Sequence, residues 1–199
     1  PDRIHPLQLD YRGGLIVAGY GALDYLNIGS SLSLLYIAGT GGQWIARIHP
    51  NNGTADWAML ADRLSNPNDD LTSRGAMSCS QVIDACYIAG RHASYSPNFF
   101  DSDGTSAYTL STTGTGLTFD IARFSSHGYW NWVYGYRLSY GSGLSCDGAC
   151  QEIGSLATDS LGNLVVIGDS ETTDLKLGNT THQLTGGGDF DAFVGKMSS

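Results

Sequence analysis

The segment Asp101-Ser102-Asp103-Gly104 places two carboxylates in alternation, as small calcium-binding loops do. Carboxylate oxygens are preferred ligands of Ca²⁺. The residues that follow, TSAYTLST, supply no bidentate carboxylate at the spacing of an EF-hand. Two interpretations stay open: a calcium site at Asp101 and Asp103, or a solvated turn in a long loop that needs no cofactor.

The most aromatic stretch is YWNWVYGYRLSY, residues 129–140. In a strand, alternate side chains lie on one face. The face predicted here consists of Trp130, Trp132, Tyr134 and Tyr136. It would be either a platform for carbohydrate or protein contact, or a packing surface between repeats. Because Trp132 aligns with Trp57 of an earlier repeat, packing is the favoured interpretation.

Four cysteines form two close pairs, Cys79 with Cys86 and Cys146 with Cys150. Neither pair has the CxxC spacing of a zinc site, and no histidine lies nearby at ligand spacing. Two local disulfides in an extracellular protein are the favoured interpretation, and buried free thiols are the alternative. Two glycosylation sequons, at Asn52 and Asn179, agree with a secretory route.

Motifs for catalysis are missing from the sequence. It contains neither a Gly-x-Ser-x-Gly elbow nor a His-Glu-x-x-His motif. The run Gly39–Gly42, GTGG, lacks the Lys-Ser/Thr of a phosphate loop, and a tight turn explains it. A pair of carboxylates of the glycosidase type stays open, because such a pair is defined only in space.

Composition narrows the class of protein further. The 199 residues include 10 Lys and Arg against 19 Asp and Glu, which gives a net charge of -9. Nucleic-acid binding needs basic surface that displaces counterions, so it is excluded as a partner class. The longest apolar runs fall short of the roughly 18 residues of a membrane span. Short apolar runs between Gly, Asn, Asp and Ser clusters predict an all-β fold.

Similar segments recur along the chain. WIARI (Trp44–Ile48), DIARF (Asp120–Phe124) and DAFVGK (Asp191–Lys196) each combine aliphatic, small and cationic residues. The segments HPNNGTADWAML and SSHGYWNWVYGYRL follow the first two, and each is a polar turn before a strand with a tryptophan. The repeated cations, Arg47, Arg123 and Lys196, are predicted to cap a strand end or to pair with a carboxylate.

A turn-and-strand segment repeats without a gap. DYRGGLIVAG (Asp10–Gly19) matches DSLGNLVVIG (Asp159–Gly168), and both predict a hairpin turn that leads into a buried strand. The middle copy, CSQVIDACYIAG (Cys79–Gly90), keeps the end of the strand but loses the Asp-x-x-Gly turn. We expect a disulfide between Cys79 and Cys86 to clamp this hairpin in place of the turn.

These repeats resemble the bacterial β-propeller repeat called SBBP. That family has a recurrent Asp-Ala-Phe-Val-Ala-Lys strand, a Ser-x-Gly-Asn turn and a Tyr-Val-x-Gly strand. The match is best over residues 153–197, with GSLATDSLGNLVVIG and DAFVGK, and looser upstream. The resemblance implies a β-propeller fold and a surface or secreted protein, but no single activity.

The expected fold is therefore one all-β domain, residues 1–199. It would be a β-propeller-like array of four-stranded antiparallel blades with partial repeats at about 1–48, 45–123 and 121–199. Each repeat would contain the Ile-Ala-Arg strand, the Trp strand, a strand such as IGSLATD and the VVIG strand. Three repeats are too few for a closed propeller, and the strand at Gly186–Met197 would find its hairpin partner beyond Ser199. A fragment of a longer protein or an assembling subunit is expected.

Three functions remain as hypotheses. The first is a non-enzymatic extracellular structural or scaffold glycoprotein of a cell-surface layer or appendage, whose partners are copies of itself or other surface proteins. The second is a carbohydrate-binding or adhesion module, which uses the aromatic strand and takes glycans as partners. The third is a polysaccharide-degrading enzyme on a propeller scaffold, since a fold does not fix a function.

Overall fold

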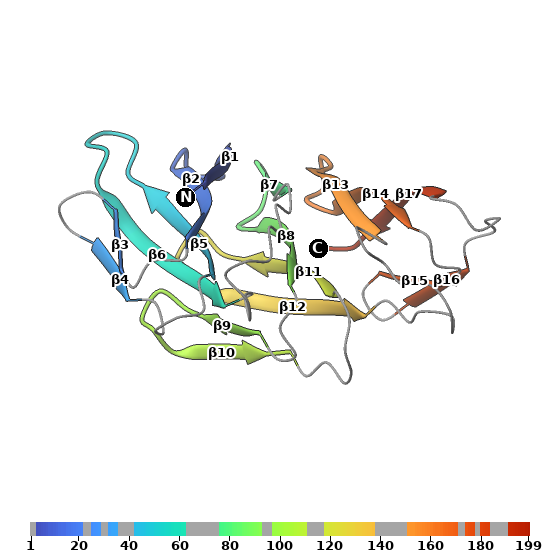
Figure 1. The fold of residues 1–199 in the computed structure, drawn as a ribbon. Helices are drawn as coiled ribbons and strands as arrows, with labels where there is room; N and C mark the ends of the chain where they lie inside the picture. The colour runs from blue at the N-terminus through green and yellow to red at the C-terminus, as the bar shows by residue number, and fades with distance from the viewer. Residues whose placement is uncertain are drawn as a thin grey trace.

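The chain is built of antiparallel β-sheets in the computed structural model (Figure 1). The structure describes residues 3–21, 25–28, 32–35, 42–62, 76–92, 97–110, 118–137, 151–170, 174–177, 180–183 and 191–199. No helix occurs among these residues, which confirms the predicted all-β class. Within the same ranges, nothing forms a helix that is long and apolar enough to cross a membrane.

The first sheet begins with four strands in sequence order, each antiparallel to the next. They are β1 (Arg3–Leu9), β2 (Leu15–Gly21), β5 (Gly42–Ile48) and β6 (Ala55–Asp62). Apart from β1, these segments are short, mainly apolar runs between turn residues, which is typical of strands that are buried in a core. The turn between β1 and β2 needs a positive φ of 76° at Gly13, a conformation that glycine adopts without a steric cost.

The second and third sheets repeat this order. The second contains β7 (Met77–Cys79), β8 (Cys86–His92), β11 (Thr118–Phe124) and β12 (Trp130–Arg137). The third contains β13 (Gln151–Thr158), β14 (Leu164–Ser170) and β17 (Asp191–Met197). In the described part of the chain, β17 is the last strand of the third sheet and forms its outer edge.

A short hairpin is inserted between the second and third strand of each sheet. The three hairpins are β3 (Tyr25–Ile28) with β4 (Leu32–Leu35), β9 (Asn98–Phe100) with β10 (Ser106–Thr109), and β15 (Asp174–Leu177) with β16 (Thr180–Gln183). Strand β9 pairs with β6 of the preceding sheet, where Phe100 lies opposite Leu60. The hairpin β9–β10 therefore ties the second repeat to the first sheet.

The recurring segments take equivalent places in the three sheets. Leu15, Cys86 and Leu164 begin the second strand of their sheets, and each lies opposite the residue after the repeated cation in the third strand. The predicted repeats divide the chain at the Ile-Ala-Arg strands, whereas the sheets divide it after β6 and after β12. A sheet is thus built of the IGSLATD-type, VVIG-type, Ile-Ala-Arg and Trp strands, in that order.

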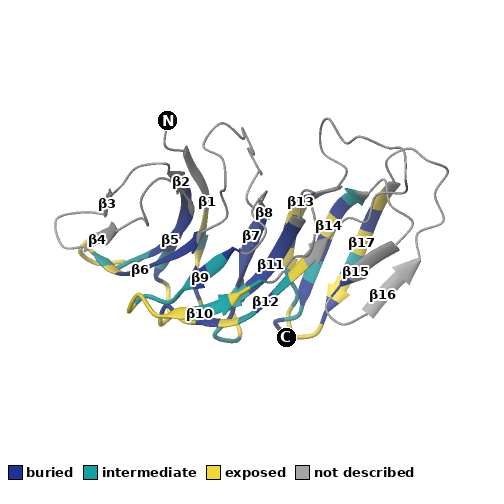
Figure 2. Ribbon diagram, turned by 60° about the horizontal axis from the view of Figure 1, so that its bottom comes forward, coloured by how far each residue is buried: buried dark blue, intermediate teal, exposed yellow. Residues whose placement is uncertain are grey.

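The three sheets pack in chain order, and the middle sheet buries side chains on both faces (Figures 1 and 2).

We call the face of a sheet that points toward the next sheet its forward face, and the opposite face its rear face. Forward positions are Ile16, Ala18, Ile45 and Met59 in the first sheet, Tyr87, Ala89, Ile121 and Trp132 in the second, and Val165, Ile167, Val194 and Lys196 in the third. Rear positions are Leu7, Leu9, Val17 and Trp44 in the first sheet, Met77, Cys79, Ile88 and Phe124 in the second, and Leu156, Leu164, Val166 and Phe193 in the third.

Two apolar cores result from this packing. Between the first and second sheets, Trp57, Phe99, Phe124 and Trp130 meet edge to face, with ring centroids 5.2–6.2 Å apart. Such aromatic contacts add to the free energy gained from burial alone. The second core lies between the middle and third sheets and contains Tyr87, Ile121, Leu164 and Val166. The strands do not close into a barrel or a ring in the described part of the chain.

Candidate functional site

The most regular polar feature is a turn that is built twice in the same way. Asp10 Oδ1 accepts hydrogen bonds from the backbone N–H groups of Arg12 and Gly14, both at 2.8 Å. Asp159 Oδ1 accepts the equivalent bonds from Leu161 and Asn163, both at 2.9 Å. An aspartate that caps its own turn in this way fixes the chain reversal between the first two strands of a sheet.

A cation from the third strand completes each turn. Arg47 Nε lies 2.6 Å from Asp10 Oδ2, and its Nη1 contacts Asp56. Lys196 Nζ lies 2.7 Å from Asp159 Oδ2. These contacts bear out the pairing with a carboxylate that was expected for two of the repeated cations. The hydrogen bond to Asp10 raises the pKa of Arg47, and the bond to Lys196 holds the pKa of Asp159 well below its usual range.

The middle turn differs from the other two. Ser80 takes the place of the aspartate, and its Oγ accepts the N–H groups of Val82 and Ile83 at 3.1 and 3.2 Å. The turn closes by a bond from Ser80 N to Ala85 O, one residue further along than in the other copies. Arg123, the equivalent of Arg47, keeps a buried Nε that makes no hydrogen bond with any described residue. Serine stands where the first sheet has the aspartate that pairs with Arg47. The equivalent partner is therefore absent for Arg123.

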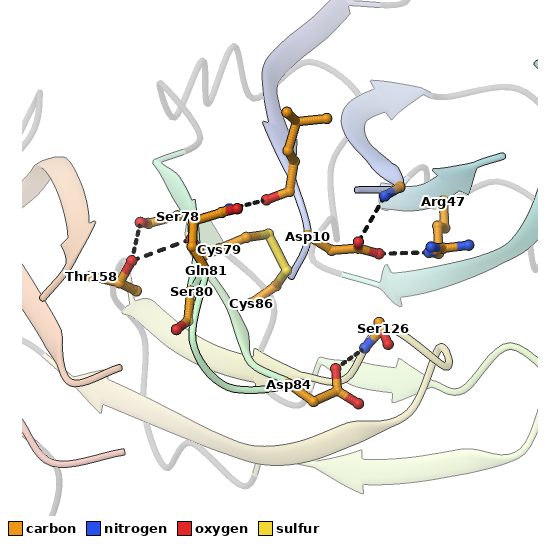
Figure 3. The surroundings of a disulfide bond; sticks show 12 residues. Asp10, Arg47, Ser78, Cys79, Ser80, Gln81, Asp84, Cys86, Ser126 and Thr158 are labelled. Carbon is orange, nitrogen blue, oxygen red and sulfur yellow. Dashed lines mark hydrogen bonds and ion pairs between the residues drawn. A yellow bond between two sulfur atoms is a disulfide. The ribbon is translucent and has the colours of Figure 1, made fainter. Parts of the chain in front are cut away.

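A disulfide joins Cys79 and Cys86 at the base of this altered turn (Figure 3). The two residues lie directly opposite each other in β7 and β8. Both are buried in the core between the first and second sheets. The cross-link that the sequence predicts is therefore present, where the capping aspartate and the ion pair are lost. The second predicted pair, Cys146 and Cys150, lies outside the described residues.

Removal of the disulfide should destabilise the protein. A double variant, Cys79→Ala with Cys86→Ala, is expected to lose about 2–3 kcal/mol of unfolding free energy, because the cross-link restricts the unfolded chain even for a short loop. Urea unfolding monitored by tryptophan fluorescence measures the difference. Addition of a reductant should lower the midpoint of the wild-type protein by more than that of the double variant, in which only the predicted Cys146–Cys150 pair is left to reduce. A double variant as stable as the wild type would show that the cross-link is not needed.

The same region connects all three sheets. Gln81 Nε2 donates to Leu9 O of the first sheet at 2.7 Å. Toward the third sheet, Thr158 Oγ1 donates to Cys79 O at 3.2 Å, and the hydroxyl of Tyr87 donates to Gly162 O at 2.9 Å. Figure 3 shows the hydrogen bonds of Gln81 and Thr158 on opposite sides of β7, the strand that contains Cys79. The altered turn thus lies at a junction between sheets.

The aromatic strand does not present one continuous face. Trp132 lies opposite Arg123 and Trp130 lies opposite Phe124, so Asn131 is an extra residue and forms a β-bulge. The bulge turns Trp130 to the rear face, where it packs on Phe99 and Phe124. Trp132 and Tyr134 stay on the forward face, half-buried against the second core.

This geometry places the aromatic rings in packing roles. The indole N–H of Trp130 donates to Phe100 O at 3.0 Å, and that ring is buried. Trp132 contacts the rings of Tyr87 and Tyr134, with centroids 6.0 and 4.9 Å away. The backbone of Tyr136 belongs to β12, and its side chain lies outside the described part. Three of the four predicted contact residues therefore support the cores between sheets.

In the candidate calcium loop, Asp103 caps its own turn, whereas Asp101 connects the loop to the start of β12. Asp101 Oδ1 accepts the N–H of Trp130 at 2.8 Å, and Asp103 Oδ1 accepts the N–H of Thr105 at 2.8 Å. Burial raises the pKa of Asp101, whereas the hydrogen bonds from Thr105 lower the pKa of Asp103. Across the described ranges, no three His, Cys, Asp or Glu side chains gather as a metal site would require.

One predicted glycosylation site lies in an exposed turn. Asn52 and Thr54 are exposed, between β5 and β6, and both the N–H and the hydroxyl of Thr54 donate to Asn52 Oδ1, at 3.0 and 2.8 Å. A modifying enzyme can reach such a turn without unfolding a sheet. The second sequon, at Asn179, falls outside the described residues.

A further acidic side chain connects two turns that the sequence separates. Asp84, in the β7–β8 turn, accepts the N–H of Ser126 at 2.6 Å, and its other oxygen lies 3.2 Å from His127 Nδ1 (Figure 3). The residues stand more than 40 positions apart, and no motif marks them. Asp84 thus joins the first and third turns of the middle sheet, a connection that local sequence patterns do not contain.

The capping aspartate of the third sheet should make stability depend on pH. Lys196 and then Asn163 lower the pKa of Asp159 in the folded state. Its contribution is therefore complete above the unfolded pKa of about 3.9 and is lost as the pH falls toward the folded pKa. The unfolding free energy of the wild type, measured by urea titration at several pH values, should fall more steeply with acidification than that of Asp159→Asn. Parallel curves would contradict the prediction.

No family model matches this sequence, and no curated protein matches it significantly. The repeated motif residues act in turns, in ion pairs and in the packing between sheets.

Proposed function

We propose that this protein is a non-enzymatic structural or scaffold glycoprotein of an extracellular surface layer or appendage. In this proposal the sheets are blades of a propeller-like array related to the SBBP repeat. The protein acts through contacts with copies of itself or with other surface proteins. The observation that carries the proposal is the equivalence of the three sheets: the recurring segments take the same strand positions in each, and the first and third sheets also share the same turn contacts.

The use of the repeated residues supports a structural role. Asp10 with Arg47 and Asp159 with Lys196 hold the first hairpin of a sheet to its third strand. Trp57 and Trp132 take the same place in two sheets, and each belongs to a core between sheets or packs against one. Repeats whose shared residues serve the packing of one sheet on the next are typical of arrays that present large surfaces.

Two features support an extracellular location. The disulfide between Cys79 and Cys86 fits an oxidising compartment, because cytosolic reductants keep most thiols free. The sequon at Asn52 lies in an exposed turn that a glycosylating enzyme can reach. Together they favour secretion over residence in the cytosol.

The carbohydrate-binding alternative had its main support in the aromatic strand. Trp130 is buried between two sheets, and Trp132 and Tyr134 pack against a core. A ring that stacks on sugar needs an open face, so these residues do not favour that alternative. Among the residues that the structure describes, no geometric observation favours the polysaccharide-degrading enzyme.

The location of the native protein tests the proposal. Mild protease treatment of intact source cells should remove it, and negative-stain microscopy of the extracted surface material should show it within assemblies. A freely diffusing protein, released into the medium without any assembled form, would contradict the structural role. A glycan array on the same material tests the second hypothesis: strong binding to one class of sugar would favour an adhesion module.

A further inference from the structure

The forward face of the third sheet has exposed apolar side chains. Ile45 and Ile121, at equivalent positions in the first and second sheets, are 0% exposed, whereas Val194 in the third sheet is 74% exposed. Ile167, opposite Val194 in β14, is 45% exposed. In Figure 2, β11 is mainly dark blue, whereas yellow bands alternate with blue along β17.

On the rear face of the first sheet, two leucines of β1 are exposed. Leu7 and Leu9 are 57% and 54% exposed. They lie opposite Val17 and Leu15, as Met77 and Cys79 lie opposite Ile88 and Cys86 in the second sheet. Met77 and Cys79 are each 4% exposed, because the first sheet covers them.

One of the two open faces is a forward face, and the other is a rear face. Inside the chain, a forward face packs on a rear face twice, from the first sheet to the second and from the second to the third. The third sheet has the forward face that such a junction needs, and the first sheet has the rear face. Isolated exposed apolar residues are ordinary on protein surfaces. Here they occupy the register positions that form the two internal junctions.

We propose that two copies of this chain associate head to tail, with the forward face of the third sheet of one copy on the rear face of the first sheet of the other. Val194 and Ile167 would then take the places of Ile121 and Ala89, and Leu7 and Leu9 would take those of Met77 and Cys79. This inference rests on the proposed function, and it names the partner and both surfaces. A second copy is the occupant because the chain itself has both halves of the junction.

The geometry of the partner face limits where contact occurs. On the rear face of the first sheet, Trp44, Ala58 and Leu60 are already buried, and the hairpin β3–β4 lies against β6. The open part is the β1 side. The internal junctions use the same side, because β1 contacts β7 and β7 contacts β13. The second copy is thus expected to dock with the first strand of its first sheet.

A head-to-tail contact is heterologous, so it either closes a ring or continues as a filament. Two copies bring together six sheets, within the range of four to eight blades in closed propellers. The outer edge of β17 has no strand paired to it in the described part of the chain. An open edge of this kind also favours association.

Each copy has a net charge of -9, so the two copies repel each other. Added salt should strengthen the contact by screening this repulsion.

Single-face variants of chain 1–199 test the arrangement. Val194→Asp places a charge on the forward face alone, and Leu7→Asp places one on the rear face alone. Tyr129→Asp is the matched control, because Tyr129 is exposed to a similar degree in the β11–β12 turn and lies on neither face. Circular dichroism and thermal unfolding of each diluted variant establish that it is folded. Sedimentation equilibrium over a wide range of concentrations then measures association.

The expected result is a wild type and a Tyr129→Asp control that associate equally, while each single-face variant shows a dissociation constant raised by about tenfold or more. An equimolar mixture of the two variants should recover one junction, because Leu7→Asp keeps the forward face and Val194→Asp keeps the rear face. Recovery in the mixture identifies the head-to-tail arrangement.

Three outcomes would overturn the inference. If Leu7→Asp associates alone as the wild type does while Val194→Asp does not, two forward faces pair with each other. Wild-type association that both variants retain would leave the proposed function standing and place the contact elsewhere. A wild type that is monomeric at every concentration would reject the second copy as occupant, and the location of the native protein would still decide the structural role.

Discussion

Ile121→Ala should destabilise the fold far more than Val194→Ala, although the two residues stand at equivalent positions in their sheets. Ile121 is fully buried between the second and third sheets. Its truncation leaves a cavity and is expected to cost about 2–5 kcal/mol of unfolding free energy. Val194 is mostly exposed in the single chain, so its truncation should change the unfolding free energy by about 0.5 kcal/mol or less.

Urea unfolding at low protein concentration measures both variants without a contribution from association. Ile45→Ala supplies a second buried position and should behave like Ile121→Ala, because Ile45 is also fully covered. Equal effects of Ile121→Ala and Val194→Ala would contradict the packing of the middle sheet on the third. At high protein concentration, Val194→Ala should lower the unfolding free energy by more than at low concentration if a second copy covers this face.

Asp10→Ala is expected to cost about 3 kcal/mol, the second large effect. Asp10 is buried and accepts hydrogen bonds from Arg12, Gly14 and Arg47. Its removal leaves two turn N–H groups and Arg47 Nε without their acceptor, although Asp56 still contacts the guanidinium. Breaking a buried pair on one side costs about 3–5 kcal/mol. The partial exposure of Arg47 keeps the value near the lower limit. Chemical unfolding by urea provides the measurement.

Two variants separate the turn from the ion pair. Asp10→Asn keeps an oxygen that accepts the turn N–H groups but removes the charge, so it should cost less than Asp10→Ala. Arg47→Met removes the cation, whose side chain is 12% exposed, whereas Lys196→Met removes one that is 58% exposed. The first should be clearly destabilising and the second close to neutral, because exposed pairs contribute little. Equal effects would show that burial does not determine the strength of this pair.

The exposure of these ion pairs follows from the order of the sheets. Arg47 lies on a forward face that the second sheet covers, and Lys196 lies on the forward face of the third sheet, which is open. Arg123 lies between them in chain order, at a covered face, and lacks the aspartate. Equivalent substitutions in middle and outer repeats are therefore expected to differ in their effect on stability, because the neighbouring sheets differ.

Much of the strand and turn structure could be predicted from the sequence. The similarity of Asp10–Gly19 and Asp159–Gly168 predicted the same hairpin turn in two places, and both turns have the same capping bonds. The spacing of Cys79 and Cys86 across an altered turn predicted the cross-link that joins them. These features are local: the residues that interact lie within a few positions, and the physical chemistry of the turn needs no other part of the chain.

The site residues were predicted less well, for two physical reasons. A single extra residue, Asn131, turns Trp130 away from Trp132, and no periodicity marks a bulge in advance. The insert between the second and third strands contains a hairpin, and in the middle repeat β9 extends the preceding sheet. That pairing depends on the open edge of β6, a strand that belongs to the preceding sheet.

What the sequence by itself determined is the local structure: an all-β chain, the capped turns, the repeated cations and one cross-link. The tertiary structure decided which strands share a sheet, which faces meet, and why Ile121 is buried while Val194 is open. The reason is that backbone preference and capping act between near neighbours in the chain. Burial depends on what packs against a face, and here that is a sheet from a different repeat.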